Sequence, residues 1–505
     1  MIVPKSISYV DKWRSIRDKL MENGFKEIAD VSDAFVGVNL EQVVILGERN
    51  LGITNLYNSS VFREQNFQKI NSFDKHLSNK WSYWFIYSSF DEIKIFQKIL
   101  DESKLFKNVF IDSFEGLSGI RKYFLPISKG EVPILIGKDI DKYYFHKPSY
   151  AIKRNIIFNL KGVPKTRKIE LLLRPNKIIG QNVLTKAIKP AERVLIKTTI
   201  DEDGIFVFNT VQVIFLPDDC PYSQKFLLAV LNSVLISWFA TYFIYNKAKL
   251  TMHFDKEYAG KIPIYPATPD QQAPIISLVD AIIQKKKEYH AISQNIEDYI
   301  KFKDVGFIKL DEYIKKVTDG FDVLSSIKVK NDNFDILRVK TEGDKIILEY
   351  GIRKKVEEYE EVEEEEQTEV RGRYITEWYE AGIGSIKDRE AIEFLTKVLE
   401  GIKNFSKSKQ KSIWQKIAEV KIPEFNEYVK NGFLKYKSAI ERVKELDEEI
   451  TKIDRAIDRF VYDLYGLTEE EIQVVEKSVW GEQFEEMYSK LPSKEAAIKL
   501  SESVK

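Results

Sequence analysis

The stretch from Val194 to Phe215 reads VLIKTTIDEDGIFVFNTVQVIF. Its first part, Val194–Thr198, and its second part, Gly204–Phe215, are rich in β-branched and aromatic residues, which favour strands. Between them lies the turn signal Asp201-Glu202-Asp203-Gly204. We therefore expect a hairpin or two adjoining strands here.

The sequence on either side of this stretch extends the same pattern. Further strand candidates are Pro133–Gly137 and Lys177–Gly180, and helical patterns follow at Tyr222–Tyr245 and after Thr268. The second helix begins with Thr268 as its cap, Pro at the first position and Asp in the first turn. From about residue 126 to residue 305 we expect a mostly β region that ends in a long helix.

The N-terminal region alternates between helical and strand patterns. Asp11–Asn23 has helical spacing with Gly24 as a stop, and Lys26–Val31 and Gln42–Leu46 are strand candidates. This alternation predicts an α/β sheet. With its first visible strand at Met1, such a sheet would lack neighbours on one side, so we expect exposed apolar surface near Met1–Pro4.

The C-terminal region carries a heptad-like pattern. Apolar residues alternate at spacings of three and four, at Val443, Leu446, Ile450, Ile453, Ile457, Phe460 and Leu464. This spacing is typical of a helix packed along its length on another helix. The partner is either the helix after Thr268 or another chain. The glutamate-rich segment Glu357–Glu369 is expected to be an exposed loop or a solvated strand edge.

The charge is unevenly distributed along the chain. The 78 basic and 78 acidic residues cancel. From Lys142 to Lys197, however, fourteen Lys or Arg stand against two acids, Glu170 and Glu192, which is a net charge of +12. A short basic run is commonly a solvated face, but an excess over more than fifty residues favours a surface that attracts phosphates.

Composition excludes several other classes. The single cysteine, Cys220, excludes an internal disulfide framework, and the four histidines form no zinc-binding pattern. No signal peptide is visible, so the expected location is the cytoplasm. One uncharged run, Phe226–Asn246, is long enough to cross a bilayer. A buried helix is the favoured alternative for it.

Several phrases together resemble the TaqI-like, gamma-class adenine-N6 DNA methyltransferases, including the type IIG restriction–modification enzymes. They are MIVPKSISYVDKWRSIRDKL and IADVSDAFVGVNLEQVVILGER within Met1–Arg49, ILIGKDIDKYY from Ile134, KIIGQNV from Lys177, LLAVLNSVLISWF from Leu227, KIPIYPATPDQQAPIISLVDAII from Lys261 and IDRFVYDLYGLTEEEIQVVE from Ile457. Their order matches the order in that family.

The resemblance implies a fold and a division into domains. Residues 1–125 would be the C-terminal half of a Rossmann-like methyltransferase α/β domain, that is, an incomplete half-sheet. Residues 126–305 would be a mixed, mostly β target-recognition domain, and 431–505 a helical tail. Residues 306–430 remain an unassigned mixed region with an acidic segment.

The resemblance also implies what the chain does and what it needs. Phe35 would stack on the adenine swung out of the duplex. The glycine-rich turn that binds S-adenosylmethionine and the catalytic Pro-Pro loop are both absent from the sequence. The chain alone is therefore expected to bind no cofactor and to hold no catalytic residue. It would need a partner chain carrying the N-terminal methyltransferase half.

The candidate contacts to double-stranded DNA lie in the basic region. Lys and Arg would hold phosphates, and Arg, Gln and Asn would read base edges. The phosphate candidates are Lys153, Arg154, Lys165, Arg167, Lys168, Lys186, Arg193 and Lys197. The base-edge candidates are Arg174, Gln181 and Asn182.

Three functions remain open. The first is sequence-specific DNA binding as a specificity module of a restriction–modification system. The second is adenine methylation by the chain together with its partner. The third is a structural or membrane-associated helical protein, which depends on the uncharged run alone. No membrane and no metal are expected under the first two.

Overall fold

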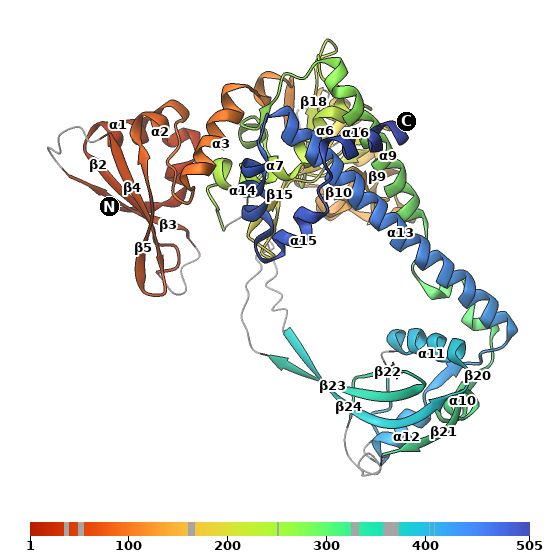
Figure 1. Ribbon diagram of the computed structural model, residues 1–505. Coiled ribbons are helices and arrows are strands. Elements are labelled where there is room, and N and C mark those ends of the chain that lie inside the picture. The colour runs from red at the N-terminus through yellow and green to blue at the C-terminus, as the bar shows by residue number, and fades with distance from the viewer. Residues whose placement is uncertain are drawn as a thin grey trace. The chain divides into compact units, whose positions relative to one another are not determined.

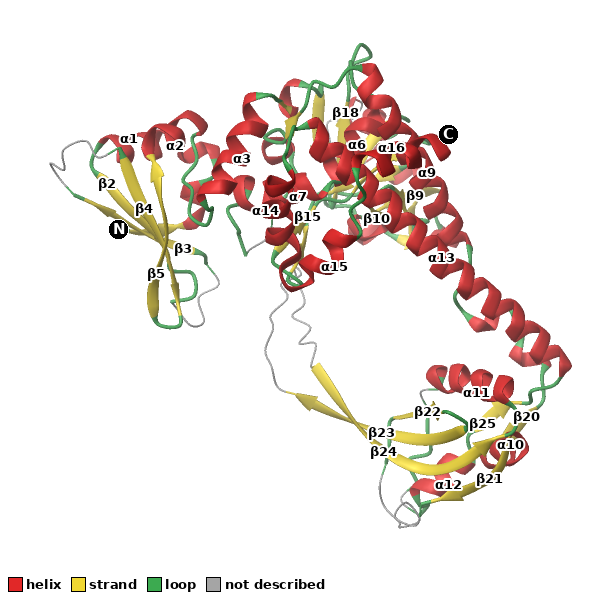
Figure 2. Ribbon diagram, in the orientation of Figure 1, coloured by secondary structure: helices red, strands yellow, loops and turns green. Residues whose placement is uncertain are grey.

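The computed structural model describes residues 1–34, 40–48, 55–159, 167–249, 252–324, 333–356, 373–402, 404–408 and 410–504. They form two compact units. The first combines Met1–His290 with Leu446–Lys505, and the second is Ala291–Glu445. Both units mix helices with several small sheets (Figures 1 and 2). This division differs from the four consecutive segments that the sequence predicts, because the C-terminal segment belongs to the same unit as the N-terminus.

The N-terminal sheet has five strands in the order β1-β3-β2-β4-β5. These are β1 (Ile2–Pro4), β2 (Phe25–Asp30), β3 (Gln42–Gly47), β4 (Leu56–Arg63) and β5 (Asn66–Asp74). The strands predicted at Lys26–Val31 and Gln42–Leu46 are thus confirmed. Of the pairings within this sheet, β2–β4 is parallel and the other three are antiparallel. The structure therefore has an α/β arrangement here, but not a parallel sheet.

The hairpin between β4 and β5 is not predicted by the sequence. Its two central residues, Glu64 and Gln65, have φ values of 49° and 63°. Such turns normally carry Asn-Gly or Asp-Gly, which tolerate a left-handed backbone. Glu-Gln gives no such signal, so tertiary packing decides this turn.

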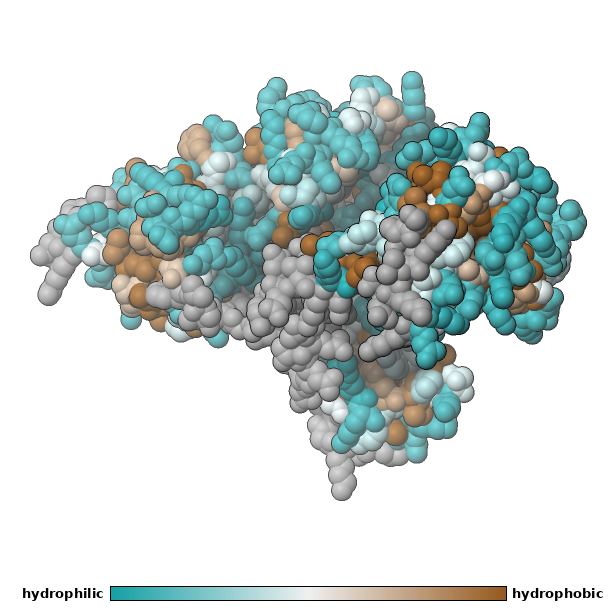
Figure 3. Space-filling model, turned by 90° about the horizontal axis from the view of Figure 1, so that it is seen from below, coloured by the Kyte–Doolittle hydropathy of each residue, from teal (hydrophilic) through white to brown (hydrophobic). Residues whose placement is uncertain are grey.

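Helices cover the N-terminal sheet and connect it to the rest of the unit. They are α1 (Arg14–Glu22), α2 (Lys75–Trp81) and α3 (Phe90–Asp101). The predicted stop at Gly24 is confirmed, since its φ is +81° and a Cβ there would lie 2.1 Å from the Glu48 carbonyl oxygen. At the sheet's edge, Met1 and Ile2 are 59% and 57% exposed, as expected. Figure 3 shows apolar surface gathered over this sheet.

The middle of the first unit contains two small sheets that face each other. One has the order β16-β13-β18-β7 and the other β17-β9-β12-β8. The strands of the first are β7 (Asp112–Glu115), β13 (Lys177–Gln181), β16 (Thr198–Asp201) and β18 (Val211–Phe215). Those of the second are β8 (Leu125–Pro126), β9 (Val132–Leu135), β12 (Tyr150–Ile152) and β17 (Phe206–Val207). Ile134, Ile179 and Val213 are fully buried in the core between them.

The prediction of a hairpin or two adjoining strands between Val194 and Phe215 is wrong. Strand β16 pairs with β13, which separates it from β18, and β17 joins the other sheet in parallel with β9. The cause lies in the predicted turn. The buried carboxylate of Asp201 accepts hydrogen bonds from the backbone N–H groups of Asp203, Gly204 and Ile205. This turn directs the chain into the second sheet instead of back along β16.

The uncharged run forms two helices and a π-helical turn. Helices α6 (Gln224–Asn232) and α7 (Val234–Phe239) are separated at Ser233, and Ala240–Ile244 continues as the π-helical turn. The helix is interrupted because the backbone of Ser233 is extended, with φ −70° and ψ 155°, and the Ser233 hydroxyl accepts the Ile236 backbone N–H as the cap of α7. No single helix among the described residues is long and apolar enough to span a membrane. The two consecutive helical segments Gln224–Asn232 and Val234–Ile244 would together be long and apolar enough, judged by length and composition alone, but they are bent by 55° where they meet. Their side chains are buried in the unit's main core.

The C-terminal helices complete this core. They are α13 (Glu427–Leu464), α14 (Glu469–Trp480), α15 (Phe484–Ser489) and α16 (Lys494–Ser503). The helix predicted after Thr268 is α9 (Pro269–Ala291). Lys285 of α9 forms an ion pair with Glu449 of α13, and Ile282 and Ile450 line one cavity. Of the two partners that the heptad pattern leaves open, the structure shows the internal one.

The second unit is built on a four-stranded antiparallel sheet in the order β21-β24-β23-β22. Its strands are β21 (Thr318–Val323), β22 (Ile336–Glu342), β23 (Lys345–Val356) and β24 (Arg373–Ile386). Helices α10 (Leu310–Val317), α11 (Arg389–Gly401) and α12 (Ile413–Ala418) and the pair β20 (Phe307–Lys309) and β25 (Lys421–Pro423) surround it. Residues 357–369, the glutamate-rich segment, lie outside the described residues.

Candidate nucleic-acid interface

The predicted phosphate contacts are spread over several elements of the first unit. Lys153 precedes α4 (Arg154–Asn159) and pairs with Glu131 at 3.3 Å, with both side chains about half exposed. The Arg154 backbone N–H donates to the same carboxylate at 3.0 Å. Glu131 thus holds the start of α4, and its pKa is lowered, first by the hydrogen bond from Arg154 and then by Lys153.

The basic loop around Lys165 falls mainly outside the described residues. Lys165 is among the residues that the structure does not describe, and for Arg167, which begins α5 (Arg167–Leu172), only the backbone is described. Lys168 is half-buried, with its Nζ 3.5 Å from the Gly116 carbonyl oxygen and 5.5 Å from the centre of the Phe114 ring. These contacts tie α5 to the segment after β7.

Two further candidates lie on the hairpin of β14 (Thr185–Ala187) and β15 (Arg193–Leu195). Lys186 pairs with Glu192 at 3.4 Å. The Arg193 guanidinium lies over the Trp480 ring at 4.7 Å and donates to the carbonyl of Ala191. Burial lowers the pKa of Arg193. Arg193 therefore joins the hairpin to α14 as well as adding positive charge.

Lys197 contacts an acidic group that it shares with α9. Its Nζ lies 3.6 Å from Asp141, and Lys286 contacts the other oxygen of that carboxylate at 2.8 Å. Burial favours a raised pKa for Asp141, but the ammonium groups of Lys286 and Lys197 outweigh it and hold that pKa below its usual value. The basic excess of the sequence is therefore partly neutralised by partners from distant segments.

The three base-edge candidates differ in exposure. Arg174 is half exposed, 3.5 Å from the fully exposed Asp218. Gln181 is buried, and its side-chain N–H groups donate to the carbonyls of Gly137 and Ile140. These bonds favour a structural role for Gln181.

Asn182 is also buried, but its side chain is only partly engaged. Its Nδ2 donates to the carbonyl of Asn209 at 3.0 Å and to Glu115 at 3.3 Å. Its Oδ1 has no hydrogen-bond partner among the described residues.

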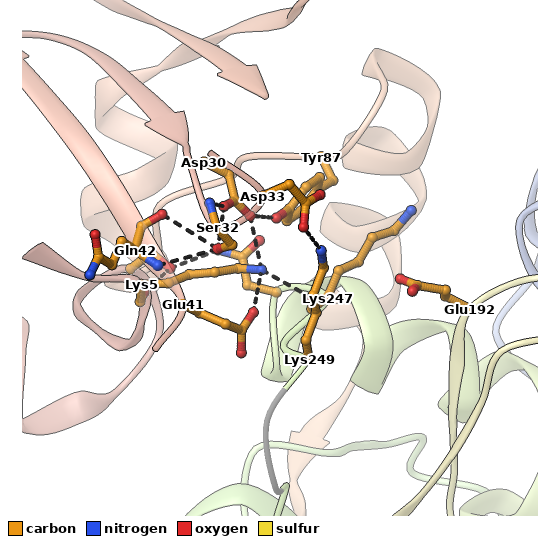
Figure 4. Close-up of polar contacts among 12 residues, drawn as sticks. Lys5, Asp30, Ser32, Asp33, Glu41, Gln42, Tyr87, Glu192, Lys247 and Lys249 are labelled. Carbon is orange, nitrogen blue, oxygen red and sulfur yellow. Dashed lines mark hydrogen bonds and ion pairs between the residues drawn. The ribbon is translucent and has the colours of Figure 1, made fainter. Parts of the chain in front are cut away.

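A buried cluster that the sequence does not predict lies beside the N-terminal sheet. The Lys5 ammonium lies 3.1 Å from Asp30 and 3.0 Å from Glu41, and it donates to the Lys247 carbonyl at 3.0 Å (Figure 4). Tyr87 donates its hydroxyl to Asp30. Nothing in the sequence indicates that a lysine directly after a strand is buried. The acidic partners of Lys5 could therefore be identified only from the folded structure.

This cluster holds both ends of the segment that contains Phe35. Asp33 pairs with Lys249, and Glu41 pairs with Lys5 (Figure 4). Phe35 itself lies outside the described residues, so its predicted stacking on a base stays a prediction. Asp33, before Phe35, contacts Lys249 in the loop after the π-helical turn. Glu41, after Phe35, is linked to the same loop through Lys5, which donates to the Lys247 carbonyl.

Comparison with known proteins supports a recognition role for the middle of the chain. Residues 132–264 match the family model of the TaqI-like C-terminal specificity domain. These residues contain most of both facing sheets, helices α6 and α7, and all eleven of the predicted phosphate and base-edge contacts. No curated protein matches the chain.

Among solved structures, the chain is similar to the HsdS subunit from Thermoanaerobacter tengcongensis. The two share 13% identity over 74% of this chain and 95% of that one, with a TM-score of 0.22. This TM-score is too low to indicate a shared fold.

Proposed function

We propose that this chain recognises a DNA sequence as the specificity part of a restriction–modification system. The observation that carries the proposal is the match of residues 132–264 to the TaqI-like specificity domain. The net charge of +12 between Lys142 and Lys197 supports it, because Lys and Arg contacts to phosphates position a protein on a duplex.

The test is binding of the full chain to a pool of random duplexes at low and physiological salt, with sequencing of the retained DNA. An enriched motif supports the proposal. Retention without a motif that vanishes with added salt, or no retention at all, contradicts it.

Exposed basic residues of the region give a second test. Alanine at the phosphate candidates Lys153 and Arg154 should weaken binding to all duplexes alike. Each phosphate contact that is lost should reduce the slope of log K against log salt by about 0.9. Lys80→Ala is the matched control, since Lys80 is a half-exposed lysine outside the basic region. An equal effect of the control would remove these two residues from the interface.

We further propose that a second chain completes the system as an adenine-N6 methyltransferase that uses S-adenosylmethionine. The sequence resemblance of Met1–Arg49 supports this, and β1 is an edge strand of its sheet, to which another strand could pair. The chain alone should transfer no methyl group from S-adenosylmethionine to a selected duplex. Methylation of adenine by the chain alone would contradict the need for a partner.

A further inference from the structure

A polar cavity lies at the β7 edge of the sheet β16-β13-β18-β7. Its volume is about 320 Å³. Glu115 of β7 and Gln212 of β18 are paired in register and therefore project from the same face of the sheet. The remaining walls are formed by Ser113 and Phe114 of β7, by Asn182 just after β13, and by His253, Asp255 and Lys256. The Phe254 backbone N–H donates to the Asn182 carbonyl at 2.7 Å and holds the segment from His253 to Lys256 in place.

Two residues that line this cavity each have a buried side-chain oxygen without a hydrogen-bond partner among the described residues. Asn182 is 5% and Gln212 is 1% exposed. The Gln212 amide donates to Ser113 Oγ at 2.7 Å. The Asn182 amide donates to Glu115 and to the carbonyl of Asn209. The Oδ1 of Asn182 and the Oε1 of Gln212 have no hydrogen-bond partner within the described part of the chain. A buried acceptor without a donor is unfavourable, so the cavity is suited to a ligand that donates.

The charged groups around the cavity favour the same kind of ligand. Glu115 is exposed at its mouth. One oxygen of Asp255 accepts from the backbone of the short helix α8 (Lys256–Ala259). Lys256 is paired with Asp112 at 3.0 Å. Among the described lining residues, acceptors thus outnumber donors that are not already paired, even when the His253 imidazole and the Ser113 hydroxyl are counted. Among the described residues, no three His, Cys, Asp or Glu side chains gather as metal ligands.

We propose that this cavity reads the exocyclic amino group of a DNA base, the N6 amino group of adenine or the N4 amino group of cytosine. These are the donors that bases present in the major groove. Guanine O6 and thymine O4 would instead bring an acceptor against Asn182 and Gln212. The inference rests on the proposed function, and it assigns the base class that one position of the recognition sequence must hold.

The test removes amino groups from the DNA. In a duplex selected by the full chain, each adenine is replaced in turn by purine and each cytosine by 2-pyrimidinone, which lack the amino group. For the unaltered protein, one position should lose about tenfold to a hundredfold in affinity. In Gln212→Met, which keeps the volume but removes the oxygen, that position should become much less sensitive.

A second variant guards against misfolding of Gln212→Met. Glu115→Gln changes an exposed side chain and should also reduce the sensitivity, whereas Glu202→Gln, an exposed glutamate that does not line the cavity, should not. If removal of the amino group costs the same in the cavity variants and the unaltered protein, the inference is overturned. If no duplex is selected at all, the proposed function fails instead, so the two failures are distinguishable.

Discussion

The ion pair of Lys177 in β13 and Asp201 in β16 is buried within the first unit. Both side chains have 0% exposure. Asp201 also accepts the backbone N–H groups that turn the chain between the two facing sheets. An ion pair buried in this way specifies the turn, and removal of one partner leaves an uncompensated charge.

Lys177→Met should therefore destabilise the first unit strongly. We expect a loss of about 3–5 kcal/mol in the free energy of unfolding. Lys153→Met, which breaks the half-exposed pair with Glu131, should cost only about 0–1 kcal/mol. Urea unfolding of both variants measures the difference. Equal losses would show that the buried pair has no special role.

Asp458 of α13 is expected to make the stability depend on pH. It is buried beside Arg455 at 2.8 Å and accepts the Val234 backbone N–H at 2.8 Å. Burial raises its pKa to about 7, although Arg455 opposes the shift. The folded state then binds this proton more tightly than the unfolded state does. The contribution to stability is present below about pH 4 and is lost as the pH rises to about 7.

Asp458→Asn should flatten this fall in stability between pH 4 and pH 7, because the amide keeps the acceptor for Val234 but does not titrate. Asp447→Asn, an exposed position of the same helix, is the control and should leave the pH profile unchanged. The unfolding temperature across this pH range is the measurement. A profile unchanged in Asp458→Asn would show that another group titrates.

At the scale of elements, the heptad pattern of α13 was predictable because periodicity is local. Ile453 and Ile457 are buried, as the pattern requires, and Ile450 is half-buried. The pattern does not identify the partner. That α9 and α14 belong to the same core follows from the return of the chain after the second unit.

Ile457→Ala should cost about 2–5 kcal/mol, because the side chain is fully buried and its removal leaves a cavity. Ile450→Ala, seven residues earlier on the same face, should cost clearly less. Chemical unfolding followed by circular dichroism measures both. A larger loss for Ile450→Ala would mean that the burial along α13 is assigned in the wrong order.

At the scale of the whole molecule, the two units have separate hydrophobic cores. The main core of the first unit includes Leu235 and Ile457, whereas Leu395 and Phe394 lie in the core of the second. Separate cores allow separate cooperative unfolding. Calorimetry of the full chain should therefore resolve two transitions.

A core substitution in each unit tests this expectation. Leu395→Ala should lower one transition and leave the other, and Leu235→Ala should do the converse. Both leucines have 0% exposure, so the two changes are matched in kind. If both variants shift a single common transition, the units unfold together.

Part of the candidate site could be read from the sequence. The basic excess from Lys142 to Lys197, the strands at Pro133–Gly137 and Lys177–Gly180 and the selection of Asn182 all depend on residue type and local pattern. The neutralising partners could not be read in this way. Asp141 and Trp480 meet the basic residues Lys197 and Arg193 only after the chain has folded.

The sequence by itself therefore determined the mixed α/β and β character, the positions of several strands and helices, and a recognition region that the family match supports. These depend on periodicity, turn residues and charge over short stretches. Only the tertiary structure decided which strands pair, as Asp201 diverts β17 into a second sheet. It alone placed Gln212 and Glu115 beside Asn182. Such pairings join residues that are distant in sequence, and their energies depend on burial that no local pattern specifies.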